Sequence, residues 1–198
     1  MRRFAIILIC AMAGLVPALA LDADIASIVE RQKAGKPVNM TDATQLMLGA
    51  EVWCYEPYEG QCGWSEIYLS VNDGLAIYES SNAWNDVYDI HIVSQAELRD
   101  NRHICDFSFD WRPSLRLTRR SDSSAVNGRE LDAVRREIVA DGPPVTENCY
   151  DFVFQGADDK VITLVMRQYT NGIHEPDLDA VVDLYFDPER AAAISWTY

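Results

Sequence analysis

Short runs of alternating apolar and polar residues, separated by turn-forming residues, constrain this sequence more than any other feature. In the run EIYLSVNDGLAIYES at 66–80, Asn72-Asp73-Gly74 separates two alternating halves, as in a β-hairpin. Further alternating runs are VYDIHIV at 87–93, CDFSFDW at 105–111, SLRLTRR at 114–120, CYDFVF at 149–154, VITLVMRQY at 161–169, AVVDLYF at 180–186 and AISWTY at 193–198. Short connections between such runs predict a largely antiparallel sheet of about seven to nine strands, strongly curved or barrel-like.

The run at 105–111 also predicts which side chains are buried. Cys105 and the three aromatic residues after it lie on one face of the expected strand, and Asp106 and Asp110 lie on the other. In an antiparallel sheet with one solvated face, the aromatic residues would point inward and the acids into water.

Helical periodicity is confined to a few segments. Apolar residues recur at helical spacing at Ile25, Ile28 and Val29, which predicts an N-terminal helix, and a second short helix is expected from Thr41 or Asp42 to about Leu48. A third helix is predicted at 127–141, capped by Asn127 and Glu130 and packed on the sheet or plugging one of its ends. Strands that outnumber helices in this way define the class as α+β.

The first twenty residues have the layout of a secretory signal peptide. Arg2 and Arg3 precede an apolar run at 4–16, and Ala18-Leu19-Ala20 supplies the small residues of a cleavage site. We therefore expect residues 1–20 to be removed and residues 21–198 to form one exported domain. The periplasm of a Gram-negative bacterium is the expected location, with the extracellular medium as the alternative. No later stretch is apolar over the length of a transmembrane helix.

Four cysteines remain after residue 20, and an even number in an exported chain indicates disulfide bonds. Four cysteines permit three pairings; proximity favours Cys54 with Cys62, which leaves Cys105 with Cys149. The spacing of Cys54 and Cys62 fits neither a zinc site nor a thioredoxin-type redox motif.

Signatures of catalysis and of cofactor binding are absent from the sequence, which predicts no catalytic residue, no cofactor and no metal site. His91 is expected on the exposed face of a strand, near Asp89. The stretch HEPDLDAVVD at 174–183 is rich in oxygen ligands. It lacks the glycine that usually turns a calcium loop around its ion, so a solvated acidic turn is the favoured interpretation.

Charge is distributed unevenly along the chain. Removal of residues 1–20 takes away Arg2 and Arg3 but no acid, which leaves 15 basic and 31 acidic residues and a net charge of −16. A chain this acidic is a poor partner for nucleic acid and a good one for a cationic protein of the envelope or the medium. A local excess of arginine allows a weak anion site, or else internal ion pairs, at Arg119, Arg120, Arg135 and Arg136.

The stretch CYEPYEGQC at 54–62 is the candidate binding loop. A disulfide between its ends would order it before binding, and its aromatic and acidic side chains suit a cationic partner. The candidate residues in and beside the loop are Trp53, Tyr55, Glu56, Tyr58, Glu59 and Trp64. The alternative is that Trp53, Tyr55 and Trp64 only cover the end of the sheet.

These features together predict an exported, non-catalytic binding domain, possible roles being an inhibitor or an immunity-type protein for a cationic envelope partner. Two alternatives belong to other classes. One is a hydrolase that acts on an envelope glycan through carboxylates. The other is a carrier that holds a small ligand inside a closed sheet, which would require a cavity in the barrel interior.

Overall fold

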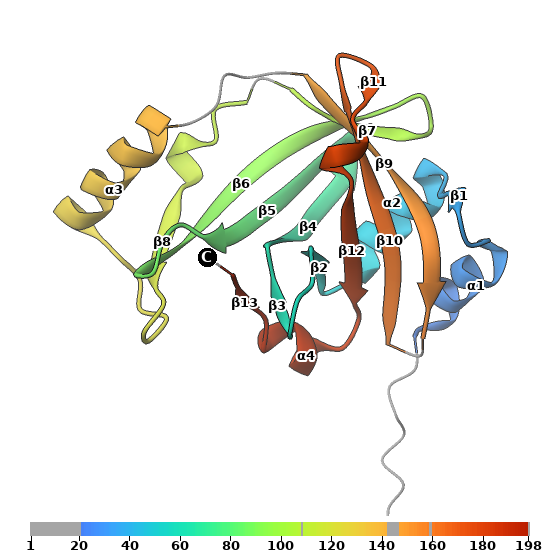
Figure 1. Cartoon of the computed structure of the whole chain (residues 1–198), viewed down its shortest axis with the longest axis horizontal. Coiled ribbons are helices and arrows are strands. Elements are labelled where there is room, and N and C mark those ends of the chain that lie inside the picture. Colours follow the sequence, from blue (N-terminus) through green and yellow to red (C-terminus); the bar gives the residue numbers. More distant parts are fainter. Residues whose placement is uncertain (1–20, 108, 142–146, 159, 198) are drawn as a thin grey trace, which may run out of the picture.

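An antiparallel barrel of eight strands forms the centre of the molecule, because β9 and β10 pair with each other and close the sheet (Figure 1). The computed structural model describes residues 21–107, 109–141, 147–158 and 160–197, so the predicted signal sequence at 1–20 lies outside the described residues. Around the barrel the strands are β9 (Asn148–Ala157), β7 (His103–Asp106), β6 (Tyr88–Arg99), β5 (Leu75–Ala83), β4 (Trp64–Asn72), β2 (Val52–Tyr55), β12 (Ala180–Tyr185) and β10 (Val161–Thr170). The predicted α+β class with a largely antiparallel sheet is confirmed, and the sheet is closed.

Three short strands extend the barrel sheet at its margins. They are β1 (Lys36–Pro37) on β9, β8 (Arg116–Arg119) on β6 and β11 (Ile173–His174) on β10. A separate parallel pair consists of β3 (Gln61–Cys62) and β13 (Ser195–Trp196), which fastens the C-terminal segment to the outside of the barrel.

The β4–β5 hairpin sets the register of the barrel interior. Asp73 and Gly74 both have positive φ, at 51° and 78°, as a two-residue type I′ turn requires. A β-bulge at Leu69 then shifts the register by one residue, so that Tyr68 lies opposite Tyr78, and both side chains are buried. Ile67 and Leu69 point outward instead and are 43% and 55% exposed.

Two N-terminal helices pack against one end of the barrel. They are α1 (Ala23–Arg31), capped by Asp22, and α2 (Met40–Gly49), and their apolar side chains join the interior core. The start predicted for α2 at Thr41 or Asp42 is wrong by one or two residues, because Asn39 is the cap and accepts a hydrogen bond from the Asp42 amide (3.0 Å). The Asp42 carboxylate instead binds Arg31 and Gln32, which ties α2 to α1 and the turn after it.

The barrel interior next to these helices is apolar and closely packed. Its largest fully buried side chains come from α1, α2 and the barrel strands: Ile28, Leu46, Met47, Trp53, Ile162, Leu164 and Leu184. Each fully buried side chain of this size contributes about 1.5–3 kcal/mol through the hydrophobic effect. This region, called the packed end below, fixes the barrel strands from one side.

The third predicted helix is present as α3 (Gly128–Asp141), and it packs on the sheet as predicted, against β8 and the adjoining part of β6. Val134 and Ile138 pack against Leu115 and Leu117 beside the part of β6 that extends beyond the barrel, on the opposite side of the molecule from α1 (Figure 1). Glu130, predicted as a capping residue, instead accepts a hydrogen bond from Tyr88 and pairs with Arg119. The remaining helical segments are η1 (Arg112–Ser114), η2 (Pro176–Leu178) and α4 (Pro188–Ala192).

The predicted strand at 105–111 is wrong in its length and its orientation. The strand β7 ends at Asp106, because β6 leaves the barrel there and the Ser114 side chain bonds both backbone groups of Val93. Asp106 faces the barrel interior, where Tyr78 and Tyr150 donate hydrogen bonds to it. Cys105 takes the outward position and forms a disulfide with Cys149 on β9.

Both predicted disulfide bonds are confirmed. Cys54 and Cys62 close the loop between β2 and β3, and Cys105 and Cys149 join two barrel strands across a separation of 44 residues. Among the described residues, no helix combines the length and the apolar character needed to cross a membrane.

Candidate functional site: the hollow end of the barrel

A cavity of about 390 Å³ occupies the barrel interior at the end away from the packed end. This volume lies within the range of small-molecule sites, about 300–1,000 Å³. Six aromatic residues line it, namely Tyr55, Trp64, Tyr68, Tyr78, Tyr150 and Phe152. Five carboxyl groups line it as well, those of Glu56, Glu66, Asp106, Asp177 and Asp179, and we call this region the hollow end.

Glu66 enters the cavity from β4, next to two tyrosines. The hydroxyls of Tyr55 and Tyr68 donate hydrogen bonds to the same carboxyl oxygen, Oε2, at 2.7 and 3.0 Å. Glu66 is half-buried by its accessible surface and lines the cavity, so its exposed part borders the cavity. The carboxyl is therefore accessible to a ligand inside the barrel.

Asp106 forms a second unit of the same kind at the end of β7. Tyr78 donates to its Oδ1 (3.2 Å), and Tyr150 donates to its Oδ2 (2.9 Å). The disulfide between Cys105 and Cys149 joins the residues directly beside Asp106 and Tyr150. This covalent link holds the aspartate and one of its tyrosines in position from two different strands.

Enclosure changes the acidity of both carboxyls. Burial raises the pKa of Glu66 to about 7, although the two tyrosine hydrogen bonds act in the opposite direction, and the nearby charge of Asp106 adds to the increase. Burial likewise raises the pKa of Asp106 above its ordinary value, against the hydrogen bonds from Tyr150 and Tyr78. Both groups hold protons more tightly than a carboxyl in water does.

The mouth of the cavity includes the segment that leads from β11 through η2 to β12. Asp177 and Leu178 are exposed there, whereas Asp179 is fixed by the protein itself. His174 Nε2 lies 2.8 Å from Asp179 Oδ1, and the amide of Gln168 donates to the same oxygen at 3.3 Å. These contacts hold the segment against β10.

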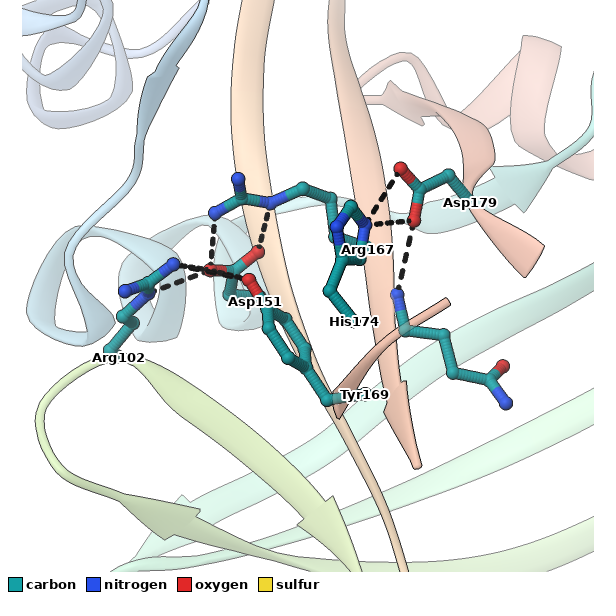
Figure 2. A network of polar contacts seen from close by, with 7 residues as sticks. Arg102, Asp151, Arg167, Tyr169, His174 and Asp179 are labelled. Atoms are coloured by element: carbon teal, nitrogen blue, oxygen red, sulfur yellow. Dashed lines mark hydrogen bonds and ion pairs between the residues drawn. The ribbon is translucent and has the colours of Figure 1, made fainter. Parts of the chain in front are cut away.

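An ion-pair network outside the barrel supports this segment. Figure 2 shows Asp151 between Arg102 and Arg167, with Tyr169 beside them and His174 and Asp179 beyond. Asp151 is fully buried and accepts two hydrogen bonds from Arg167, at 2.7 and 2.6 Å. The ring of Tyr169 lies 5.2 Å from that of His174, so the network is continuous with the residues that fix Asp179.

The carboxyls of the hollow end are compatible with two kinds of chemistry, ligand binding and acid catalysis. A glycoside hydrolase needs one protonated and one ionised carboxyl, whose environments push their pKa values apart. Burial raises the pKa of both Glu66 and Asp106, and tyrosine hydroxyls occupy oxygens of both groups. A protonated Glu66 near neutral pH would still be able to donate a proton, which keeps acid catalysis as the alternative chemistry.

Part of the predicted binding loop lines the cavity, and part of it does not. Tyr55, Glu56 and Trp64 line the cavity, and the rings of Tyr55 and Trp64 stack with centroids 4.7 Å apart. Trp53 is fully buried in the packed end, and Tyr55 is buried as well. Neither side chain is therefore accessible to a macromolecular partner. The exposed residues of the loop are Glu56, Tyr58 and Glu59, and both glutamates have positive φ, near 50°.

The four arginines of the predicted anion site make separate contacts. Arg119 pairs with Glu130, Arg120 with Asp89 and Arg135 with Asp132. Arg120 also donates to the backbone oxygen of Trp196, at 2.7 Å. Arg136 is exposed on α3. The contacts of the first three are the internal ion pairs that the sequence allowed as an alternative.

His91 is not exposed as expected, because the C-terminal segment covers it. Its Nδ1 lies 2.8 Å from Ser81 Oγ, its Nε2 lies 3.0 Å from Thr118 Oγ1, and the ring of Trp196 lies edge-on to it. Burial lowers the pKa of His91; the negative charge of Glu79 opposes this decrease, and the positive charge of Arg116 adds to it. Within the described ranges, no three His, Cys, Asp or Glu side chains group as a metal site would require.

Sequence reasoning missed the residues at the centre of the cavity: Glu66, Tyr68, Tyr78, Asp106 and Tyr150. Glu66 and Tyr68 alternate along β4, and a β-bulge at Leu69 brings Tyr68 opposite Tyr78, whereas the type I′ turn alone would pair Tyr78 with Leu69. Alternation along β4 does not reveal this bulge, so counting back from the turn gives the wrong register.

Comparisons of the chain with models of protein families, with curated proteins and with solved structures find no match.

Proposed function

We propose that this protein is an exported, non-catalytic binding protein that holds a small ligand in the hollow end of its barrel. The observation that carries the proposal is the cavity of about 390 Å³, lined by aromatic rings and by carboxyls, of which Glu66 and Asp106 are partly buried. A protein interior is normally close-packed, and barrels with unfilled interiors are a common architecture for ligand binding. Export is supported by the signal-like residues 1–20 and by the two disulfide bonds.

A cavity-filling variant tests this proposal. Ala96 is buried on β6 and lines the cavity, so Ala96→Leu would occupy part of the space. The matched control is Ala133→Leu, which makes the same change at an exposed position of α3. Each protein, purified without denaturation, is exposed to an extract of small molecules, and the retained compounds are released and identified by mass spectrometry.

The proposal predicts compounds that the wild type and Ala133→Leu retain and Ala96→Leu does not. It also predicts that these compounds raise the melting temperature of the wild type, because a ligand that binds only the folded state stabilises it. If no compound depends on the cavity in this way, and a panel of amines, sugars, carboxylic acids and lipids gives no thermal shift, the proposal is wrong.

The exposed part of the loop supports a second candidate, contact with a cationic partner protein. Tyr58 is 64% exposed beside Glu59, on a chain of large negative charge. Neither residue lines the cavity, so Tyr58→Ala combined with Glu59→Lys would disrupt such a surface and leave the cavity intact. A cationic protein that the wild type retains from an envelope extract, and the double variant does not, would support this candidate; equal retention would contradict it.

A further inference from the structure

The hydrogen bonds between four tyrosines and two carboxyls leave the centre of the hollow end with acceptors and no free hydroxyl donor, while Trp64 and Gln168 carry the N–H groups of the lining. Each of four tyrosine hydroxyls has a single proton, and each donates that proton to Glu66 or to Asp106. With both carboxyls ionised, a ligand would therefore meet only carboxyl oxygens and the lone pairs of tyrosine oxygens at the centre of the cavity. A ligand that supplies several N–H or O–H donors matches this arrangement.

One carboxyl oxygen is free to receive such a donor. Both tyrosines at Glu66 bind Oε2, and among the described residues no side chain or amide donates a hydrogen bond to Oε1. Glu66 lines the cavity and retains accessible surface there. Oε1 is therefore a polar atom inside the barrel that only a ligand or water can satisfy.

The charge of the lining selects for a cation. The cavity is lined by five carboxyl groups, and the described residues around it include no lysine, arginine or histidine. An ionised carboxylate held away from water is unfavourable unless a positive charge or several hydrogen-bond donors lie next to it. An ammonium group with N–H bonds meets both requirements, whereas a quaternary ammonium group offers the charge without the donors.

The carboxyls form two tiers. Glu66 and Asp106 are partly buried inside the barrel, whereas Glu56 and Asp177 line the cavity but are exposed, which places them at its mouth. Asp179 is excluded from either tier because His174 and Gln168 occupy its oxygens. Aromatic rings, among them the stacked pair of Tyr55 and Trp64, form apolar walls for the same cavity.

We propose that the cavity binds a linear aliphatic diamine or polyamine, with one ammonium group at Glu66 and Asp106 and a second at the mouth near Glu56 and Asp177. The hydrocarbon chain would lie against the aromatic walls, where cations and alkyl groups are both favourable. This inference rests on the proposed function, because it names the ligand class of the same cavity.

Isothermal titration calorimetry at low salt and about pH 8, above the pKa of about 7 of Glu66, tests the inference with a matched set of probes. Hexamethylenediamine is compared with hexylamine, with bis-quaternary hexamethonium, with uncharged hexanediol and with anionic adipate. We expect one diamine per protein, bound at least about tenfold more tightly than hexylamine or hexamethonium, and no binding of the diol or the diacid.

Single variants assign the two tiers. Glu66→Gln should weaken the diamine and hexylamine alike, whereas Glu56→Gln should weaken the diamine and leave hexylamine unchanged. Glu59→Gln is the control, because Glu59 belongs to the same loop but does not line the cavity. If Glu66→Gln does not fold, Ala96→Leu replaces it, since filling the cavity should abolish binding of both amines.

Several results would overturn the inference. Equal affinity for hexylamine and the diamine would show that Glu56 and Asp177 do not bind a second ammonium group. Binding that survives Ala96→Leu would show a general attraction of amines to an acidic surface. If an uncharged or anionic compound fills the cavity and amines do not, the ligand class is wrong while the proposed function stands. If no compound of any class depends on the cavity, both proposals fall together.

Discussion

The two ends of the barrel interior are built from the same strands and differ in what those strands place inside. At the packed end, Leu164 on β10 is fully buried among apolar side chains that include those of α1 and α2. One inward position further along the same strand, Met166 borders the cavity of the hollow end. The barrel therefore combines a half that stabilises the fold with a half that leaves space and buries carboxyls, and the second half is where a function is to be sought.

Shortening one side chain in each half is the strongest test of this comparison. Leu164→Ala should lower the free energy of unfolding by about 2–5 kcal/mol, because it creates a void in a packed core. Met166→Ala should lower it by less, since one side of Met166 already faces empty space. Chemical denaturation measures both values; equal losses would mean that the hollow end is as closely packed as the other.

The disulfide beside the hollow end should stabilise the protein and also position cavity residues. The double variant Cys105→Ala, Cys149→Ala is expected to lose about 2–4 kcal/mol of unfolding free energy, because the bond restricts a long stretch of the unfolded chain. The same variant should weaken any ligand of the cavity, since Asp106 and Tyr150 adjoin the two cysteines. Removing Cys54 and Cys62, which close a shorter loop, provides the comparison. A larger loss from the shorter loop would contradict this account.

Glu66 should make the stability of the hollow end depend on pH. Its pKa is about 7 in the folded protein and about 4.5 when unfolded, so the folded state binds the extra proton between these values. Stability from this group is complete below about pH 4.5 and is lost as the pH rises to about 7, by up to about 3 kcal/mol.

Glu66→Gln removes the ionisable group and should abolish this decrease. Denaturation midpoints of the wild type and Glu66→Gln, compared across the same pH range, measure the difference. Parallel pH profiles of the two proteins would show that Glu66 is not enclosed. Leu164→Ala is a suitable control, because it should shift the whole profile without changing its slope.

The smallest change in the free energy of unfolding is expected for a substitution at the mouth of the cavity. His174→Leu removes the partner of Asp179, a contact between partly exposed groups, and should change the unfolding free energy by less than about 1 kcal/mol. Amide hydrogen exchange of Glu175, Asp177 and Leu178 should become faster, because the segment would open locally. Unchanged exchange there would show that other contacts hold the mouth.

The sequence predicted those parts of the structure that depend on local pattern. The type I′ turn at Asp73 and Gly74, the helix at Ile25 and Ile28 and both disulfide pairs follow from residue spacing and are present. Alternation shows which residues share a face of a strand, but it does not show which face is inside.

The site was missed for that reason. Sequence reasoning placed Asp106 in solvent, yet it points into the barrel, because this interior is polar at one end. The sequence predicted that α3 packs on the sheet, but not that it packs where β6 extends beyond the barrel, a long-range feature that periodicity does not encode. Tyr55, Glu56 and Trp64 were singled out for a partner protein and line the cavity instead.

The hollow end holds the Glu66 carboxyl inside the barrel, where a ligand can reach it. The most direct test is a titration of the glutamate carboxyl carbons by ¹³C nuclear magnetic resonance, with Glu66→Gln to assign the signal. We predict one glutamate with a pKa of about 7, absent from the variant, and a lower pKa when an ammonium ligand occupies the cavity. A Glu66 that titrates near 4.5, like a carboxyl in water, would contradict the account.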